Sequence, residues 1–308
     1  MRRTEPPDGL RGRAALTSEL VASGVARSRL RHADVTRPHR GVAGFGVPDR
    51  DVLDRCAAYE PIMLPGQFFS HATAATLWGM WLPEGVPDLL DVAVLDPRTP
   101  PRRPGIAGRR VSRVELGFVH GFAVVSPADA WCQLGAVVAR DNLVAAGDSA
   151  LPAAHRSGAA SLDAIANAAV RHRGTPGAAR AAEALGLLRP GVESRPETLL
   201  RLALRRARLP EPAVAAAVTL PDGRSYHPDL SYPELRIAIE YEGDGHRTDR
   251  RQWERDVERY ERFADAGWRV IRVTATQLFR DARAVAARVR AAIRAARSAP
   301  PARRAGSR

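Results

Sequence analysis

The segment LRIAIEYEGDGH, residues 235–246, decides how the C-terminal part of the chain is expected to fold. Apolar side chains alternate with polar or small ones from Leu235 to Glu242, which is the period-2 pattern of a β-strand. The apolar residues at the odd positions are expected to face a core, so Glu240 and Glu242 share the opposite face. Glycines then end the strand.

A third carboxylate, Asp229, precedes this strand, and the intervening sequence Ser-Tyr-Pro-Glu at 231–234 is typical of a turn. A hairpin through that turn would bring Asp229 alongside Glu240. Two like charges about 4 Å apart repel by roughly 4 kcal/mol at an effective dielectric of about 20, so protons or a cation must offset the repulsion. Carboxylate oxygens suit Mg²⁺, and the sequence therefore predicts a metal site for phosphoryl transfer. The alternative is that Glu240 and Glu242 are solvated residues at a strand end.

Further features occur in order around these acids. A predicted helix carries Glu197 ahead of them, and the sequence Arg-Asp at 255–256 and the segment 267–272 follow. With the spacing Asp-x(10)-Glu-x-Glu-Gly-x-x-His, this order resembles the very-short-patch-repair-like endonuclease domains of the PD-(D/E)XK restriction-endonuclease-like superfamily. The resemblance implies an α/β domain over residues 192–296, with helices flanking a mixed sheet.

The resemblance also implies roles for the acids. Asp229 and Glu240 would bind Mg²⁺ or another divalent cation, and Glu197 would be the acid on the first helix. Glu242 falls where the superfamily's usual lysine stands, and the chain contains no lysine, so all 47 basic residues are arginine. Either Glu242 or His246 is then the group that activates water, because a carboxylate or an imidazole near a metal can accept a proton. The missing lysine is the feature that favours a non-catalytic protein.

Glu197 has a second interpretation. The sequence from Ser194 to Glu197 matches the capping box Ser-x-x-Glu, which closes the N-terminus of a helix. Glu197 is therefore either a capping residue or an active-site acid.

The charge of the chain points to a polyanionic partner. A net charge of +13 and a pI near 11.1 favour nucleic acid, and DNA first, although a genome that prefers arginine codons is the alternative. The sequence lacks the strongly amphipathic basic helix of a membrane-surface protein. Cys56 and Cys132 lack the spacing of a zinc site or a disulfide framework. Without an apolar leader or a run of about 18 apolar residues, the protein is expected to be cytoplasmic.

The N-terminus carries a candidate DNA-binding segment. Two short helices, at 16–22 and 26–32, are expected around Ser-Gly at 23–24, as in a helix-turn-helix, and the segment 37–42 is a candidate wing. The second helix would present three arginines to phosphates and guanine edges, or simply form a solvated basic face. These arginines are Arg27, Arg29 and Arg31.

Residues 51–150 are expected to form an α+β block. Its Ser-His-x-x-Ala-Ala helix at 70–75 and its Ser-Pro-x-Asp sequence at 126–129 resemble the N-terminal half of AbiEi-type antitoxin proteins. This resemblance implies binding to DNA or to a partner protein and supplies no catalytic residue. His71 and Asp129 are therefore interpreted as packing and capping residues.

Five regions follow from these patterns. They are a winged-helix-like segment (1–50), an AbiEi-like α+β domain (51–150), a helical linker (151–191), an endonuclease-like α/β domain (192–296) and a disordered basic tail (297–308). The leading hypothesis is a metal-dependent DNA endonuclease whose later helix holds the phosphate backbone through Arg250, Arg251, Arg255 and Arg259. The alternatives are a non-catalytic, antitoxin-like DNA-binding regulator and an RNA-directed nuclease.

Overall fold

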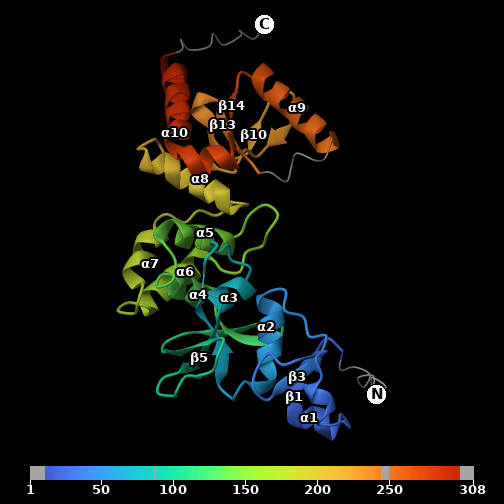
Figure 1. Ribbon diagram of the computed structural model, residues 1–308. Coiled ribbons are helices and arrows are strands. Elements are labelled where there is room, and N and C mark those ends of the chain that lie inside the picture. The colour runs from blue at the N-terminus through green and yellow to red at the C-terminus, as the bar shows by residue number, and fades with distance from the viewer. Residues whose placement is uncertain (1–10, 87, 244–249, 299–308) are drawn as a thin grey trace. The chain divides into compact units, whose positions relative to one another are not determined.

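The computed structural model describes residues 11–86, 88–243 and 250–298, with the backbone alone at 250–257. The chain divides into two compact units, Met1–Leu143 with Leu162–Leu185, and Val144–Ser161 with Gly186–Arg308 (Figure 1). Helices and mixed sheets occur in both, so the expected α/β class is confirmed. The expected linker, 151–191, is divided between the two units. Among the described helices, none is both long and apolar enough to cross a bilayer.

The first unit begins with a small antiparallel sheet of order β1-β3-β2. Its elements are β1 (Ala14–Leu16), α1 (Thr17–Ala22), η1 (Arg29–Arg31), β2 (Val35–Thr36) and β3 (Val42–Phe45). The expectation of a second helix at 26–32 is wrong, because only the 3₁₀ turn η1 forms there. The segment buries Leu30 alone between Val25 and Val35, and one buried residue does not offset the cost of nucleating a short helix.

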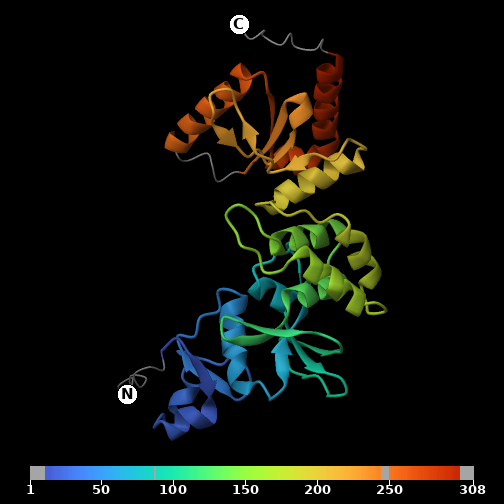
Figure 2. The same cartoon turned by 180° about the vertical axis from the view of Figure 1, so that it is seen from behind.

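A five-stranded sheet of order β6-β5-β4-β8-β7 forms the rest of the first unit, with helices packed on it (Figure 2). Its strands are β4 (Gln67–Phe69), β5 (Leu90–Leu95), β6 (Ile106–Val111), β7 (Leu116–Val119) and β8 (Phe122–Val125). Its helices are α2 (Val52–Tyr59), η2 (Glu60–Ile62), α3 (His71–Leu77), α4 (Pro127–Leu134), α6 (Leu162–Arg171) and α7 (Ala178–Leu185). The helix α5 (Arg140–Ala150) begins in the residues of this unit and ends in those of the next.

The second unit is built on a four-stranded mixed sheet of order β14-β13-β12-β9. Its strands are β9 (Ala213–Val214), β12 (Leu230–Tyr232), β13 (Ile237–Glu242) and β14 (Arg269–Thr274), with a separate pair β10 (Val218–Thr219) and β11 (Ser225–Tyr226). Its helices are α8 (Arg195–Arg206), η3 (Pro233–Leu235), α9 (Arg250–Asp265) and α10 (Ala275–Ser298). Strand β13 runs antiparallel to β12 and parallel to β14, and α9 connects β13 to β14.

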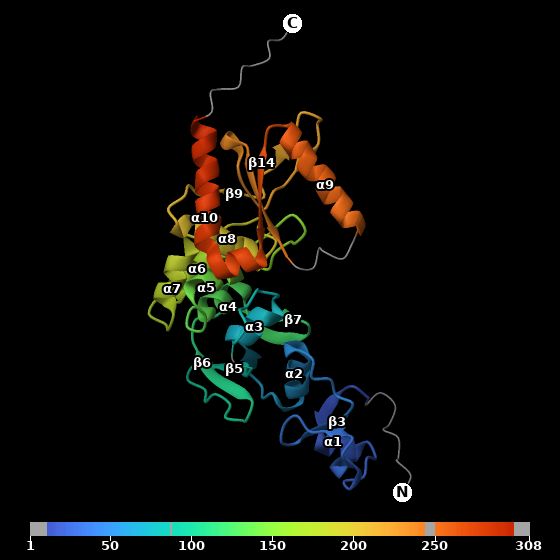
Figure 3. The ribbon, with the colours of Figure 1, turned by 45° about the horizontal axis from the view of Figure 1, so that its top comes forward.

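Both faces of this sheet are covered (Figure 3). Helices α8 and α10 pack on one face, where Ile237 and Ile239 are buried with Leu200 and Val289. Helix α9 covers the other face, where Ala238 packs against Phe263. The alternation expected along β13 is therefore present, and the face that carries Glu240 is enclosed by a helix.

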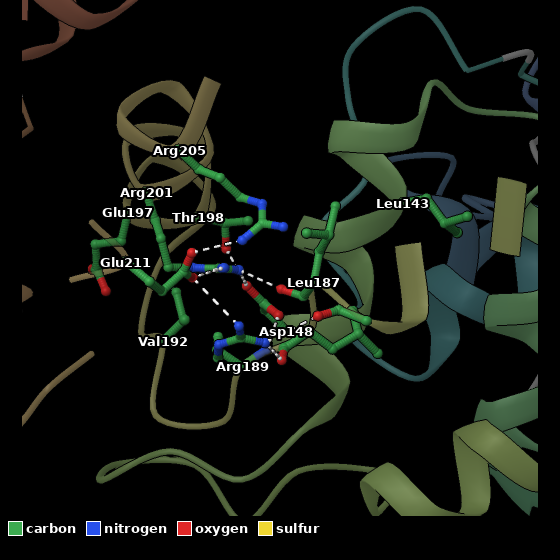
Figure 4. Close-up of polar contacts among 12 residues, drawn as sticks. Leu143, Asp148, Leu187, Arg189, Val192, Glu197, Thr198, Arg201, Arg205 and Glu211 are labelled. Carbon is green, nitrogen blue, oxygen red and sulfur yellow. Dashed lines mark hydrogen bonds and ion pairs between the residues drawn. The ribbon is translucent and has the colours of Figure 1, made fainter. Parts of the chain in front are cut away.

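A buried ion network fixes α8 within the second unit (Figure 4). Arg201 and Asp148 are both 0% exposed, and Nη2 of Arg201 lies 3.0 Å from Oδ2 of Asp148. The same carboxylate accepts hydrogen bonds from the amide N of Arg189 at 2.7 Å and from Oγ1 of Thr198 at 2.8 Å. Arg201 also donates through Nη1 to Glu211 at 2.9 Å. The segment that contains Asp148 is thereby joined to the first turns of α8.

Candidate active site

The hairpin of β12 and β13 places Asp229 next to Glu240. The 3₁₀ turn η3 and Arg236, which has a left-handed φ of 50°, reverse the chain between the two strands. Leu230 pairs with Ile239, so Asp229 precedes β12 opposite Glu240. Oδ2 of Asp229 accepts a hydrogen bond of 2.7 Å from the amide N of Tyr241, which fixes the carboxylate against β13.

The two glutamates of β13 lie beneath α9. Glu240 is only 5% exposed, so it is not the solvated strand-end residue of the alternative interpretation. Nη1 of Arg259 lies 3.7 Å from Oε1 of Glu240. Glu242 is half-buried, and its Oε1 accepts hydrogen bonds from the hydroxyl of Tyr260 at 3.2 Å and from Nε of Arg272.

Tyr260 binds both of these arginines. The guanidinium carbons of Arg259 and Arg272 lie 5.1 and 5.0 Å from the centre of its ring, which is the range of cation–π contacts. Nη2 of Arg259 also donates to the Tyr260 hydroxyl at 3.2 Å. Burial raises the pKa of Tyr260, so the phenol stays a hydrogen-bond donor at neutral pH. Two arginines and one phenol thus face the acids of β13.

Tyr260 and Arg272 were not among the site residues predicted from the sequence. A signal for Arg272 exists, since in a parallel pair the residues that share a register point to the same face, and Arg272 pairs with Glu240. For Tyr260 the sequence gives no comparable signal, because the rotation of α9 over the sheet decides which of its side chains reaches Glu242.

Glu197 lies in the first turn of α8, which follows the N-cap residue Ser194. Ser194 is the N-cap and accepts from the amide N of Glu197 at 3.4 Å. The Glu197 carboxylate accepts from the amide N of Glu193 at 3.0 Å and is 8% exposed. Burial, and next the charge of Asp229, raise the pKa of Glu197 to about 7. The acceptor role differs by one residue from the expected capping box, in which Glu197 would accept from the amide of Ser194 itself, and the role of an active-site acid stays a prediction.

The acids act on one another as a group. Burial raises the pKa of Asp229 to about 7, and the neighbouring charge of Glu240 adds to the increase, although the Tyr241 amide and Arg259 oppose it. Because the charge of Asp229 also raises the pKa of Glu197, the two titrate together. Raised carboxyl pKa values of this kind occur in active sites and also in buried structural networks.

The raised pKa values predict a pH dependence of stability. Between about pH 4 and pH 7 the folded state holds protons on Asp229 and Glu197 that the unfolded chain has already released, since ordinary carboxyl pKa values lie near 4. Their favourable contribution to the free energy of unfolding is complete below about pH 4 and is lost as the pH rises through about 7.

Urea unfolding at pH 5 and pH 8 measures this effect. We expect Asp229→Asn, which keeps an acceptor for the Tyr241 amide but cannot ionise, to lose less stability than the wild type between the two pH values. The other titrating groups are the same in both proteins, so their contributions to the free energy of unfolding cancel in the comparison. An equal loss in the two proteins would contradict the raised pKa of Asp229.

No protein-family model matches the chain. Two curated proteins of Mycobacterium tuberculosis are similar to it: uncharacterized protein MT2308 of strain CDC 1551 / Oshkosh and uncharacterized protein Rv2248 of strain ATCC 25618 / H37Rv. Each is 26% identical over 247 residues, which cover 80% of this chain and 88% of the relative. Neither name states an activity, so the function has to be inferred from the site itself.

The donor chemistry of the site fits a hard cation in part. Asp229 and Glu240 offer carboxylate oxygens, and Mg²⁺ is commonly held by one or two carboxylates while it keeps several waters. Within the described part of the chain, no three histidine, cysteine, aspartate or glutamate side chains are arranged to hold a metal ion together. His246 lies outside the described residues. Of the described residues, Asp229 and Glu240 are the two that would hold a divalent cation.

The arginines predicted to contact nucleic acid occupy different surroundings. Arg27 and Arg31 are exposed, whereas Arg29 donates to Asp34 through two hydrogen bonds of 2.9 and 2.7 Å. Arg259 points toward Glu240 and Tyr260. The side chains of Arg250, Arg251 and Arg255 lie outside the described residues.

The first unit holds a second buried polar cluster around Asp129. Its carboxylate accepts from Oγ of Ser126 at 2.7 Å and contacts Nε2 of His172 at 2.9 Å and Arg171 at 3.2 Å. Burial lowers the pKa of His71 to about 3, so that imidazole is neutral. Asp129 thus pairs with Ser126, the N-cap residue of α4, as expected of a capping residue, and the packing role of His71 stays a prediction.

Proposed function

We propose that the protein is a metal-dependent DNA endonuclease that hydrolyses phosphodiester bonds. The observation that carries this proposal is the grouping of Glu197, Asp229 and Glu240 in the second unit, with pKa values of about 7 for the first two. Such a cluster is costly for folding, because like charges are buried together, and it is typical of a functional site.

Each acid has a role in this proposal. Asp229 and Glu240 hold a divalent cation, which when bound stabilises charge that develops on the phosphate. Glu197 holds or releases a proton near neutral pH, because its pKa is about 7. Glu242 or His246 accepts the proton of the attacking water. Since Oε1 of Glu242 already accepts from Arg272 and Tyr260, its Oε2 is the oxygen suited to that role.

The positive charge of the chain supports DNA as the substrate. The net charge of +13 favours the phosphate backbone, and such binding weakens steeply as salt is added. Arg272 and Arg259 lie at the acids and can contact the phosphate that is cut. The first unit would bring the second to DNA or bind a partner protein.

A non-catalytic DNA-binding regulator is the second candidate. The feature that favours it is Glu242, which stands where the resembling nucleases have lysine and is paired with Arg272. In that case the second unit keeps the nuclease-like fold, and the arginines that face the acids replace the cation.

Nicking of supercoiled plasmid separates the two candidates. We expect open circles to form with Mg²⁺ or Mn²⁺ and not with EDTA. A gel shift of DNA in EDTA without cleavage in either metal would favour the regulator. An RNA of the same sequence, cut in preference to the DNA, would identify an RNA-directed nuclease.

Metal binding has a readout that does not depend on cleavage. At pH 8, where the acids are mostly ionised, a divalent cation should raise the melting temperature of the wild type, because a ligand that binds the folded state stabilises it. The increase should be absent in Asp229→Asn. An equal increase in both proteins would place the cation elsewhere.

A further inference from the structure

A groove lies between the C-terminal half of α8 and a kink in α10. The kink is at Asp281, whose φ of −146° and ψ of 63° are not helical. Oδ1 of Asp281 accepts from the amide N of Ala284 at 2.9 Å, so it caps the second segment of α10. The cavity beside the kink has a volume of about 590 Å³.

Small apolar side chains form the floor of this groove, and its rim is cationic and aromatic. Ala203 and Ala207 of α8 line it together with Ala286 of α10. Phe279, at the rim, is 55% exposed, an unusual environment for a large aromatic side chain. Three exposed arginines stand around it: Arg206, Arg280 and Arg283.

We propose that this groove binds a single strand of nucleic acid, with an unpaired base stacked on Phe279 and the phosphates held by the three arginines. An aromatic platform flanked by cationic groups is the usual arrangement for single strands, because every base has a π-face and every nucleotide a charge. Guanidinium groups also bind phosphate oxygens bidentately. The chain's charge of +13 is complementary to this polyanion.

An unpaired strand fits better than a duplex. In a duplex the bases are already stacked on each other, so none is available for Phe279 without the cost of unstacking. The groove and Glu197 share α8: Ala203, which lines the groove, follows Glu197 by six residues, or roughly 9 Å along the helix at 1.5 Å per residue.

Binding of a single strand in the groove rests on the proposed nuclease function. It is measured without metal, so that a failure of binding and a failure of cleavage can be told apart. Fluorescence anisotropy in EDTA measures binding of a labelled 12-nucleotide oligothymidine. We expect Phe279→Ala to weaken binding roughly 5- to 150-fold, the range found for loss of one stacked base. The double variant Arg280→Gln/Arg283→Gln should reduce the dependence of log K on log salt by about 1.4, since a single strand contributes about 0.7 per contact.

Matched controls come from the same chain. Phe118, in β7 of the first unit, is 76% exposed, and Arg294 is an exposed arginine of α10 outside the groove, so Phe118→Ala and Arg294→Gln should leave binding unchanged. With an abasic strand of equal length, the effect of Phe279→Ala should disappear. Unchanged binding in Phe279→Ala, or an equal loss of affinity for an abasic strand or a poly-glutamate peptide, would overturn the inference.

Discussion

Asp148→Ala is expected to lower the free energy of unfolding of the second unit by about 3–5 kcal/mol, the usual cost of removing one partner from a buried ion pair. Arg201 is 0% exposed, so without Asp148 its charge would stay buried with a single carboxylate, Glu211, as its counterion. The Arg189 amide and the Thr198 hydroxyl would lose their acceptor as well. Each buried donor that is left without an acceptor adds to the cost.

Urea unfolding combined with hydrogen–deuterium exchange measures this loss. Because the chain has two units, exchange of amides at 198–204 and 237–241 reports the second unit separately from the first. The control is Arg110→Ala, since Arg110 and Asp96 lie 3.5 Å apart with side chains 60% and 58% exposed, and such pairs contribute at most about 1 kcal/mol.

A double variant tests whether the pair itself is responsible. Asp148→Ala/Arg201→Met removes both charges, so it should lose less stability than the sum of the two single variants. Additive losses, or a loss below about 1 kcal/mol for Asp148→Ala, would show that the network does not hold α8 in place.

Local sequence patterns were sufficient to predict the acid hairpin. Alternation along 235–242 identified β13, although the strand begins only at Ile237, and the proline-containing turn, which lies two residues later than expected, implied an antiparallel partner. Together these two features bring Asp229 opposite Glu240, across only eleven positions of the chain. The alternation of side chains and the residues of the turn are local properties of the sequence, and they decide the pairing of a short hairpin.

The contacts that could not be predicted join distant parts of the sequence. Asp148 and Arg201 are separated by 53 positions, and the Ala- and Gly-rich composition between them suggested a linker. Composition identifies where helices break, but it does not show which charged residues will meet in a core. Likewise, the arginines of α9 indicated a DNA-binding face, whereas Arg259 turns toward Glu240, which a charge count cannot reveal.

Asp229→Asn is expected to reduce Mg²⁺-dependent cleavage by at least roughly 100-fold, the scale on which a single charge-stabilising group affects catalysis. Asparagine is nearly isosteric, and its side-chain oxygen can still accept from the Tyr241 amide, so the hairpin should be preserved. The change removes one of the two carboxylates proposed to hold the cation. Initial rates of plasmid nicking, measured at several Mg²⁺ concentrations, give the effect.

Glu234→Gln is the matched control, because Glu234 is an exposed carboxylate in the turn of the same hairpin. It should retain the full rate, and both variants should bind DNA in EDTA as the wild type does. Removing the charge of Asp229 also relieves its repulsion with Glu240 and Glu197, so Asp229→Asn should be at least as stable as the wild type at pH 8. A variant that is stable and binds DNA but does not cut would assign the loss to the site. A full rate in Asp229→Asn would instead mean that the three acids do not catalyse cleavage.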